Sequence, residues 1–284
     1  MENFILQIEK KLWEYFSQEP AIITAKPYLQ NYGDEATIET IKKNRIEITD
    51  TEHPVLKSVR DILSAQNLNY KPHVYEGVNE KSDSPMACFV STEGLYLHYN
   101  PLILGPLDQD EMFTIVAHEI GHLIFPMQIN PEEYFKIAYL SYLGNPTDLL
   151  RFTILAHMLT HINEYNADRY SLYVTSNLEK YESALQKIYD IVLIISPEFP
   201  NREKLESIVN MAWYEKFRLK HPMINDRLTA LKLVENNITQ SGFNINDDKE
   251  ICQRFKELIC YDQFIEMFGE DYEELINMSK HNKQ

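Results

Sequence analysis

The sequence predicts a mainly helical α+β protein that contains a small antiparallel sheet. Between residues 71 and 100, short segments rich in β-forming residues alternate with Gly, Asn, Ser and Pro. Most of the remaining chain carries apolar residues at the three-to-four spacing of amphipathic helices. Only 8 glycines and 13 prolines occur among 284 residues, and 25% of the residues are charged. This composition is typical of a globular protein rather than a fibrous or disordered one.

The expected elements follow one another from helices to strands and back to helices. Helices are expected at 2–18 and 54–66, and strands at 73–75, 87–90 and 95–99, with no clear pattern around 32–50. The strand Leu95–Tyr99 is expected at the edge of the sheet. The next helix starts at Asp108, forms a capping box with Glu111 and ends at Pro126. Further helices are expected near 147–176, 178–195, 202–219, 223–236, 248–268 and 270–280.

Three consecutive segments are predicted from these elements. Residues 1–53 form an N-terminal helical segment, and residues 54–236 form the central domain with the sheet. Residues 237–284 form a C-terminal helical appendage, whose helices are candidates for binding a protein partner.

Charge and cysteine content restrict the function classes. The 27 basic and 43 acidic residues give a net charge of −16, which disfavours nucleic acid and anionic membranes as partners. The three cysteines show no paired spacing, which suits a reducing compartment. The first residues form an amphipathic helix rather than a signal peptide, and no apolar run is long enough for membrane insertion. We therefore expect a cytoplasmic protein.

The segment Ala117–His122 has the spacing of a metal-binding helix. His118 and His122 lie four residues apart, so both imidazoles project from one helical face and could bind one metal ion. Glu119 follows the first histidine, where its carboxylate could take a proton from metal-bound water. Gly121 costs about 1 kcal/mol relative to Ala inside a helix. Another element is therefore expected to pack closely against it.

A third ligand is expected about forty residues later. Glu164 could complete the three protein ligands of a catalytic zinc site on a second helix. Asp168 lies one turn further on and could accept a hydrogen bond from His118 or His122. Without the HExxH segment, both acids would be interpreted as part of a solvated surface.

Other histidines and one arginine are weaker candidates. His157 and His161 precede Glu164 near the same helical face, as alternative ligands, active-site donors or packed interface residues. His221 comes just before a helix start at Pro222 and could stabilise an oxyanion. Arg227 could pair with an acid or hold a substrate carbonyl.

These blocks together resemble the zinc metallopeptidase family that includes HtpX and the CaaX prenyl proteases. The matching stretches are Tyr99–Leu104, Leu107–His122, Asn163–Asp168, and His221-Pro222 with Arg227. The resemblance covers about residues 54–236 and implies a zincin-like fold.

The same resemblance implies the roles of individual residues. One zinc ion would bind to His118, His122 and Glu164, with Glu119 as general base, Asp168 supporting a histidine, and His221 near the reacting carbonyl. The chain departs from the membrane members of the family, because it has no transmembrane helix. It also has Met223 where a second proline is common.

The expected activity is zinc-dependent hydrolysis of peptide bonds in a peptide or protein. An extended substrate could add to the edge strand by backbone hydrogen bonds, close to Leu97, His98 and Tyr99, although a purely structural strand is an equal alternative. His161 is a further candidate for substrate contact.

Two other functions remain open. One is a regulatory metalloprotease similar to the ImmA/IrrE group, which acts on repressors. The other is a latent or non-catalytic zinc-bearing protein that binds a partner.

Overall fold

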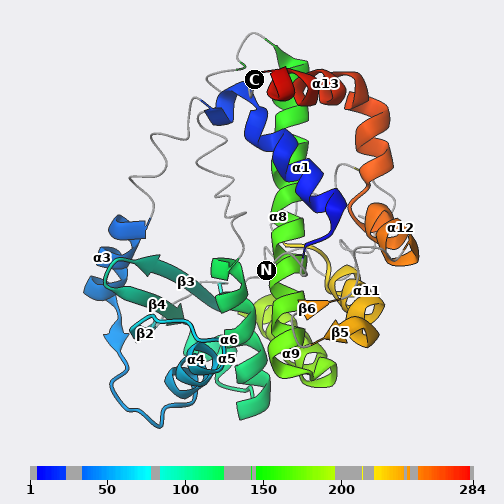
Figure 1. Ribbon diagram of the computed structural model, residues 1–284. Coiled ribbons are helices and arrows are strands. Elements are labelled where there is room, and N and C mark those ends of the chain that lie inside the picture. Colours follow the sequence, from blue (N-terminus) through cyan, green and yellow to red (C-terminus); the bar gives the residue numbers. More distant parts are fainter. Residues whose placement is uncertain are drawn as a thin grey trace. The chain divides into compact units, whose positions relative to one another are not determined.

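The computed structural model describes residues 5–23, 34–77, 84–124, 142, 145–195, 213, 221–239, 242–243 and 249–281 (Figure 1). The chain divides into two compact units. Unit 1 comprises Met1–Asn31, Met127–Asn166 and Ile208–Gln284, and unit 2 comprises Tyr32–Pro126 and Ala167–Ser207. The units interleave along the chain and do not follow the three consecutive segments expected from the sequence.

Unit 2 contains a four-stranded sheet built from β1 (Ile46–Glu47), β2 (Pro72–Glu76), β3 (Met86–Ser91) and β4 (Gly94–Tyr99). The strand order is β1-β2-β4-β3. The β1–β2 and β3–β4 pairs are antiparallel, whereas β2 and β4 are parallel. The α+β class is confirmed, but the prediction of an antiparallel sheet is wrong, because the chain leaves β2, forms β3 and returns as β4 between them.

The strand before the motif helix is not an edge strand. Leu97 of β4 pairs with Val74 of β2 on one side and Cys88 of β3 on the other. The prediction of an edge position for Leu95–Tyr99 is therefore wrong. Since the backbone of β4 is paired on both sides, an extended substrate cannot add to it at Leu97, His98 or Tyr99. Among the described strands, β3 forms that edge of the sheet.

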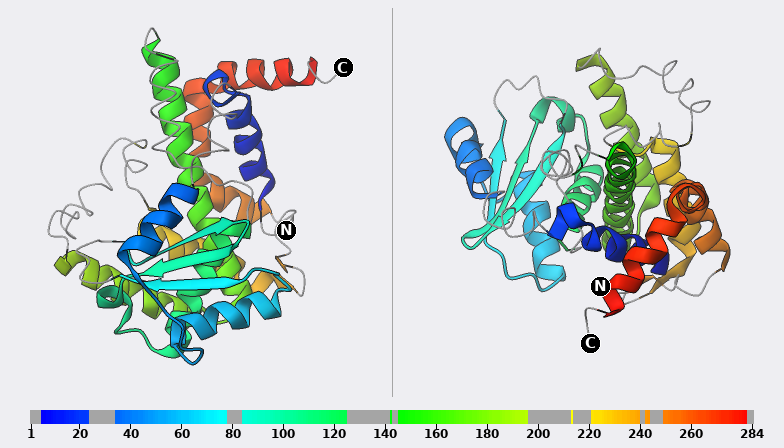
Figure 2. Two further views of the ribbon diagram at one scale, coloured as in Figure 1. Left: turned by 90° about the vertical axis from the view of Figure 1, so that its left-hand side faces the viewer. Right: turned by 90° about the horizontal axis from the view of Figure 1, so that it is seen from above.

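Helices cover both faces of the sheet (Figure 2). On one face, α3 (Asp34–Asn44) packs Ile38 and Ile41 against Tyr75 and Tyr96. On the other face lie α4 (Pro54–Ala65), which contacts β2, and α6 (Gln109–Ile124), which contacts β3. The sheet therefore separates α3 from the helix that carries the HExxH segment.

His98 lies on the face of the sheet that α3 covers. Its neighbours in register are Tyr75 and Ala87, and its ring stacks on Phe89 with 6.0 Å between centroids. Burial, with a smaller contribution from Arg45, lowers the pKa of His98 to about 4. His98 is thus neutral at pH 7 and packs on the side of the sheet away from α6.

The helices of unit 2 include α5 (Pro101–Leu104) and α9 (Leu178–Ile195). The long α8 (Pro146–Thr175) carries Glu164 and Asp168 one turn apart, and the division between the units falls between them. The expected helices at 147–176 and 178–195 are confirmed to within one residue.

Unit 1 brings the two ends of the chain together. It contains α1 (Gln7–Gln18), α11 (Ile224–Val234), η3 (Glu235–Asn237), β5 (Ile238–Thr239), β6 (Gly242–Phe243), α12 (Lys249–Leu258) and α13 (Tyr261–His281). Tyr15 of α1 contacts the rings of Phe264 and Tyr272 at centroid distances of 6.1 and 4.6 Å. Because α1 and α13 share this aromatic core, the C-terminal helices belong to the same compact unit as α1.

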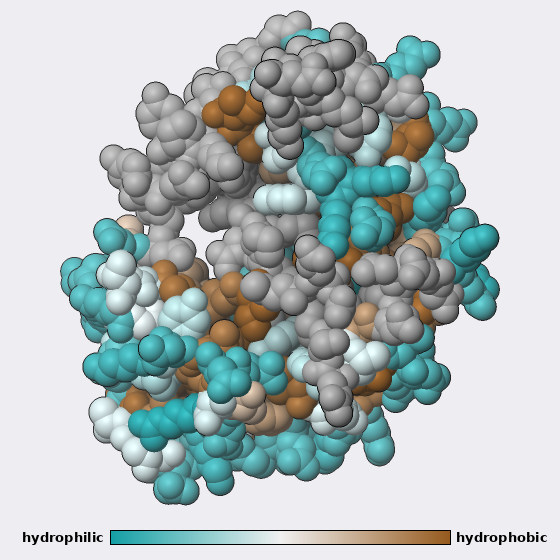
Figure 3. Space-filling view, in the orientation of Figure 1, coloured by the Kyte–Doolittle hydropathy of each residue, from teal (hydrophilic) through white to brown (hydrophobic). Residues whose placement is uncertain are grey.

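The C-terminal helices also have a different break from the expected one. Cys260 has φ 51° and lies between α12 and α13, whereas Gly269 is inside α13. A residue with left-handed backbone dihedral angles commonly ends a helix, whereas a glycine can lie within a helix. Figure 3 shows the outer side of α12 as hydrophilic, in keeping with the burial of Ile251 and Phe255 on its inner side.

Some expectations cannot be compared with the structure. The helix near 202–219 and the helix end at Pro126 lie outside the described residues, apart from Trp213. Within the parts of the chain that are described, no helix is both long and apolar enough to cross a membrane.

Acid should destabilise the protein through His98. The folded state binds this proton only near pH 4, whereas an unfolded histidine binds it near 6.5, so protonation below pH 6.5 favours unfolding. Between pH 7.5 and 5.0 we expect His98 to account for a loss of about 1–2 kcal/mol in the free energy of unfolding, allowing for partial screening. Denaturant titrations of wild type and His98→Phe at both pH values measure this difference. An equal pH effect in the two proteins would contradict the assignment.

Candidate metal centre

The helix that carries the HExxH segment begins with the expected capping box. The Asp108 side chain accepts hydrogen bonds from the backbone N–H of Asp110 and Glu111, at 3.0 and 2.9 Å. The Glu111 carboxylate accepts from the backbone N–H of Asp108 at 2.8 Å. The reciprocal bonds satisfy the first amides of α6 and fix where the helix starts.

A second helix locks this capping box in place. Glu111 is 1% exposed, and its carboxylate accepts from Ser183 at 2.6 Å and from Lys187 at 2.7 Å. Burial alone would raise the pKa of Glu111, but the hydrogen bonds from Lys187 and Ser183 bring the pKa below its usual value. Lys180 pairs with Asp108 at 2.6 Å and lowers the pKa of that carboxyl. Thus α9 holds the first turn of α6.

The HExxH side chains converge three turns further along α6. The Nε2 atoms of His118 and His122 are 3.1 Å apart, and the two rings meet edge to face. Glu119 belongs to the same group, in which one donor atom from each residue lies within 4.8 Å of the others. His118 is 6% exposed, while Glu119 and His122 are half-buried, so the group opens toward solvent on one side.

Asp168 lies beside the first of these histidines. Its Oδ1 is 2.8 Å from His118 Nδ1, across the contact between α6 and α8. The sequence predicted this type of contact and left open which histidine makes it. Tyr181 of α9 adds its hydroxyl, which lies 2.9 Å from His118 Nδ1 and donates to Asp168 Oδ1. The Nδ1 side of His118 is thereby occupied by hydrogen bonds, and Nε2 is the nitrogen that faces His122.

The expected close packing at Gly121 is confirmed. A Cβ atom at Gly121 would lie 3.0 Å from Ala167 Cα and 3.2 Å from both Ala167 O and Tyr170 Cβ. Ser171 also donates a hydrogen bond to the carbonyl of Thr114 at 2.7 Å, so the part of α8 from Ala167 to Ser171 runs beside α6. The absence of a side chain at Gly121 is what allows the two helices to approach and Asp168 to reach His118.

The remaining sequence candidates gather within unit 1. Glu164 is 6% exposed, and its Oε1 lies 3.2 Å from His221 Nδ1. Its Oε2 lies 3.7 Å from a terminal nitrogen of Arg227, on the first turn of α11. Two residues of one sequence block, His221 and Arg227, therefore meet the Glu164 carboxylate of another.

The positions of the other candidate residues say less about their function. His161 is 3% exposed on α8, one turn before Glu164, and His157 is half-buried. Tyr99 Oη lies 3.2 Å from His53 Nε2, and Leu97 is fully buried in the core of unit 2. Neither Leu97 nor Tyr99 extends the group around His118.

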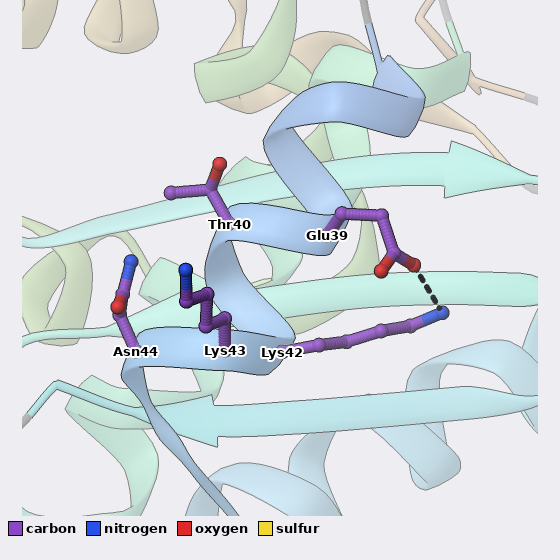
Figure 4. Close-up of a pocket in the computed structure, with 5 residues that line it drawn as sticks. All are labelled: Glu39, Thr40, Lys42, Lys43 and Asn44. Carbon is purple, nitrogen blue, oxygen red and sulfur yellow. Dashed lines mark hydrogen bonds and ion pairs between the residues drawn. The ribbon is translucent and has the colours of Figure 1, made fainter.

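Two cavities among the described residues of unit 2 lie away from this group. A shallow depression of about 550 Å³ is lined by residues of α3 alone, on the opposite side of the sheet (Figure 4). There Lys42 pairs with Glu39 and Glu93, each at 3.2 Å, so its charge is already neutralised. A second cavity of about 290 Å³ lies at the starts of α4 and α6 and includes His53 and Tyr99. Neither cavity is lined by a residue of the HExxH segment.

Tyr181 is the site residue that the sequence did not predict. It contacts His118 from 63 residues away, a pairing that only tertiary structure creates. One signal was present: Tyr181 lies on the buried face of its helix with Leu178, Ala184 and Leu185. A buried tyrosine needs a hydrogen-bond partner for its hydroxyl, so this position pointed to a polar contact.

The donor set fits a transition metal. Tetrahedral zinc with Zn–N bonds of 2.0–2.1 Å holds two ligand nitrogens about 3.3 Å apart, and the observed separation of the Nε2 atoms is 3.1 Å. Imidazole ligands suit zinc better than calcium or magnesium. His118, Glu119 and His122 therefore form a group that could hold a metal ion.

Comparisons of the chain with protein-family models, with curated proteins and with solved structures find no match. The resemblance described from the motifs thus stays a prediction.

Replacing Gly121 with Ala should force α6 and α8 apart. Overpacking costs typically about 1–3 kcal/mol, and the gain in helix propensity offsets about 1 kcal/mol of it. We expect Gly121→Ala to lower the free energy of unfolding by up to about 2 kcal/mol in denaturant titrations. Gly269→Ala is the matched control, because a Cβ there meets no backbone of another helix and only the Ile265 Cγ2 methyl at 3.3 Å. If the two variants are equally stable, the packing of α6 against α8 does not require a glycine at position 121.

Proposed function

We propose that the protein is a zinc-dependent endopeptidase. The observation that carries the proposal is the pairing of the His118 and His122 Nε2 atoms, 3.1 Å apart, with Asp168 and Tyr181 occupying the other nitrogen of His118. A chance HExxH on a helix surface has no reason to carry a buried carboxylate behind its first histidine. Such support is typical of metal-binding histidines.

The chemistry follows from the residue types. Bound zinc supplies a water of pKa about 7 and polarises a substrate carbonyl. Glu119, the neighbour of His118, would take the proton from that water and later give it to the leaving amine. Half-burial suits Glu119 to this role, because its carboxylate must meet both water and substrate.

Glu164 is our proposed third ligand. It is supported by its place one turn before Asp168 on α8, by its low exposure of 6%, and by the resemblance of the Asn163–Asp168 segment to the family motif. The Arg227 guanidinium near one of its oxygens and the His221 imidazole near the other fit a carboxylate that is held as an anion. His221, with a side chain 51% exposed, is the proposed contact for the developing oxyanion.

Glu119→Gln should keep the metal and lose the activity. The amide cannot accept the proton of the attacking water, so cleavage of an unstructured protein should fall at least about 100-fold. Metal analysis should still find one zinc per chain, since this substitution leaves the ligands in place. Asp110→Asn, at an exposed acid on the same helix, is the control and should cleave as wild type does.

The outcome distinguishes the candidate functions. Cleavage that persists in Glu119→Gln would rule out the assigned base. Zinc in the wild type without cleavage of any unstructured protein would favour a regulatory protease of narrow specificity or a non-catalytic zinc protein. Absence of zinc would overturn the proposal.

Glu164→Gln tests the third ligand. A neutral amide binds zinc poorly, so the zinc affinity measured by chelator competition should fall. We expect a fall of at least about tenfold, which is the loss seen when a residue that hydrogen-bonds a metal ligand is removed. Glu179→Gln, at an exposed acid on α9, should bind zinc as wild type does. If both variants bind zinc equally well, Glu164 is not a ligand.

A further inference from the structure

Tyr181 reaches the candidate metal centre from α9. Its side chain is fully buried, and its hydroxyl contacts both His118 Nδ1 and Asp168 Oδ1. Tyr181 itself belongs neither to the HExxH helix nor to the later acidic block. The helix α9 is therefore a third structural element behind the first histidine.

The direction of the hydrogen bonds follows from the donors present. A carboxylate only accepts, so both the Tyr181 hydroxyl and His118 Nδ1–H donate to Asp168 Oδ1. The proton of His118 is thereby held on Nδ1. Its Nε2 keeps an unprotonated lone pair, directed at the side where His122 Nε2 lies.

Asp168 depends on these donors because it has no contact with solvent. Its exposed fraction is 0%, and a buried carboxylate that loses a donor pays the full desolvation cost of the lost bond. Removing the Tyr181 hydroxyl should therefore weaken the hold of Asp168 on the ring of His118.

The helix that carries Tyr181 is itself fixed to α6. Lys187 and Ser183 bind the Glu111 carboxylate, and Lys180 binds Asp108. Two of these bonds involve a buried acid, so Tyr181 is held in a set position relative to His118. A side chain with this support is suited to orienting a ligand.

We propose that Tyr181 is a positioning residue that sets the metal affinity of the centre by orienting Asp168 and His118. This inference rests on the proposed metal site and extends it to a residue of α9. Tyr181 does not touch the metal or a substrate in this proposal and acts through Asp168.

The test is zinc affinity, measured by competition with a chromogenic chelator on the purified full chain. We expect Tyr181→Phe to bind zinc about tenfold more weakly than wild type, within the range seen when an outer partner is lost. Tyr189→Phe, two turns further along α9, is the matched control and should leave the affinity unchanged.

A double variant shows whether Tyr181 acts through Asp168. If it does, Asp168→Asn combined with Tyr181→Phe should bind zinc no more weakly than Asp168→Asn alone. Additive losses would overturn the proposed route. Wild-type affinity in Tyr181→Phe would overturn the inference while leaving the metal site intact. Failure of the wild type to bind zinc would instead overturn the proposed function and the inference together.

A measurement on the wild type covers the case in which Tyr181→Phe does not fold. Nitrogen-15 chemical shifts of the metal-free protein at about pH 8, above the usual histidine pKa, report which ring nitrogen of His118 carries the proton. A proton on Nδ1 supports the arrangement of Asp168 and Tyr181. A proton on Nε2 with an unprotonated Nδ1 would contradict it.

Discussion

The close approach of α6 and α8 at Gly121 is the constraint on which the candidate metal centre depends. A side chain at this position would meet the backbone of Ala167 at 3.0 Å, so the helices can approach only because one position has no Cβ and the other has a methyl group. One residue beyond Ala167, Asp168 then reaches His118 Nδ1 at 2.8 Å. Without that approach, the carboxylate would remain on one helix and the imidazole on another.

Local signals in the sequence predicted much of the fold. Asp108 and Glu111 form the expected capping box, because it needs only residues three apart. The HExxH spacing likewise predicted that His118 and His122 share a helical face. The sheet was predicted less well, since strands 95–99 and 73–75 were recognised while their parallel pairing was not. Pairing partners and edge positions depend on which strands meet in space, and residue patterns within a strand do not encode that.

The site shows the same limit. Asp168 could be predicted from its position one turn after Glu164, whereas Tyr181 joins His118 across 63 residues. His98 illustrates the opposite error: it lies next to the last residue of a recognised strand, yet strand alternation turns it toward α3 and away from the motif helix. The position of His98 close to the motif helix in the sequence indicated that it would lie near the site. Side chains of a strand alternate between the two faces of the sheet, however, and this alternation determines the face on which His98 lies.

Asp168 and Tyr181 provide hydrogen bonds behind His118. Asp168 and Tyr181 are both buried, and their contacts belong to the packing of α6, α8 and α9 rather than to a ligand cage. Small zinc domains behave differently, because their cores form only when metal binds. In this protein the side chains behind His118 are placed by the packing of three helices, so an ion bound at the candidate site would add to contacts that the protein makes between its own residues.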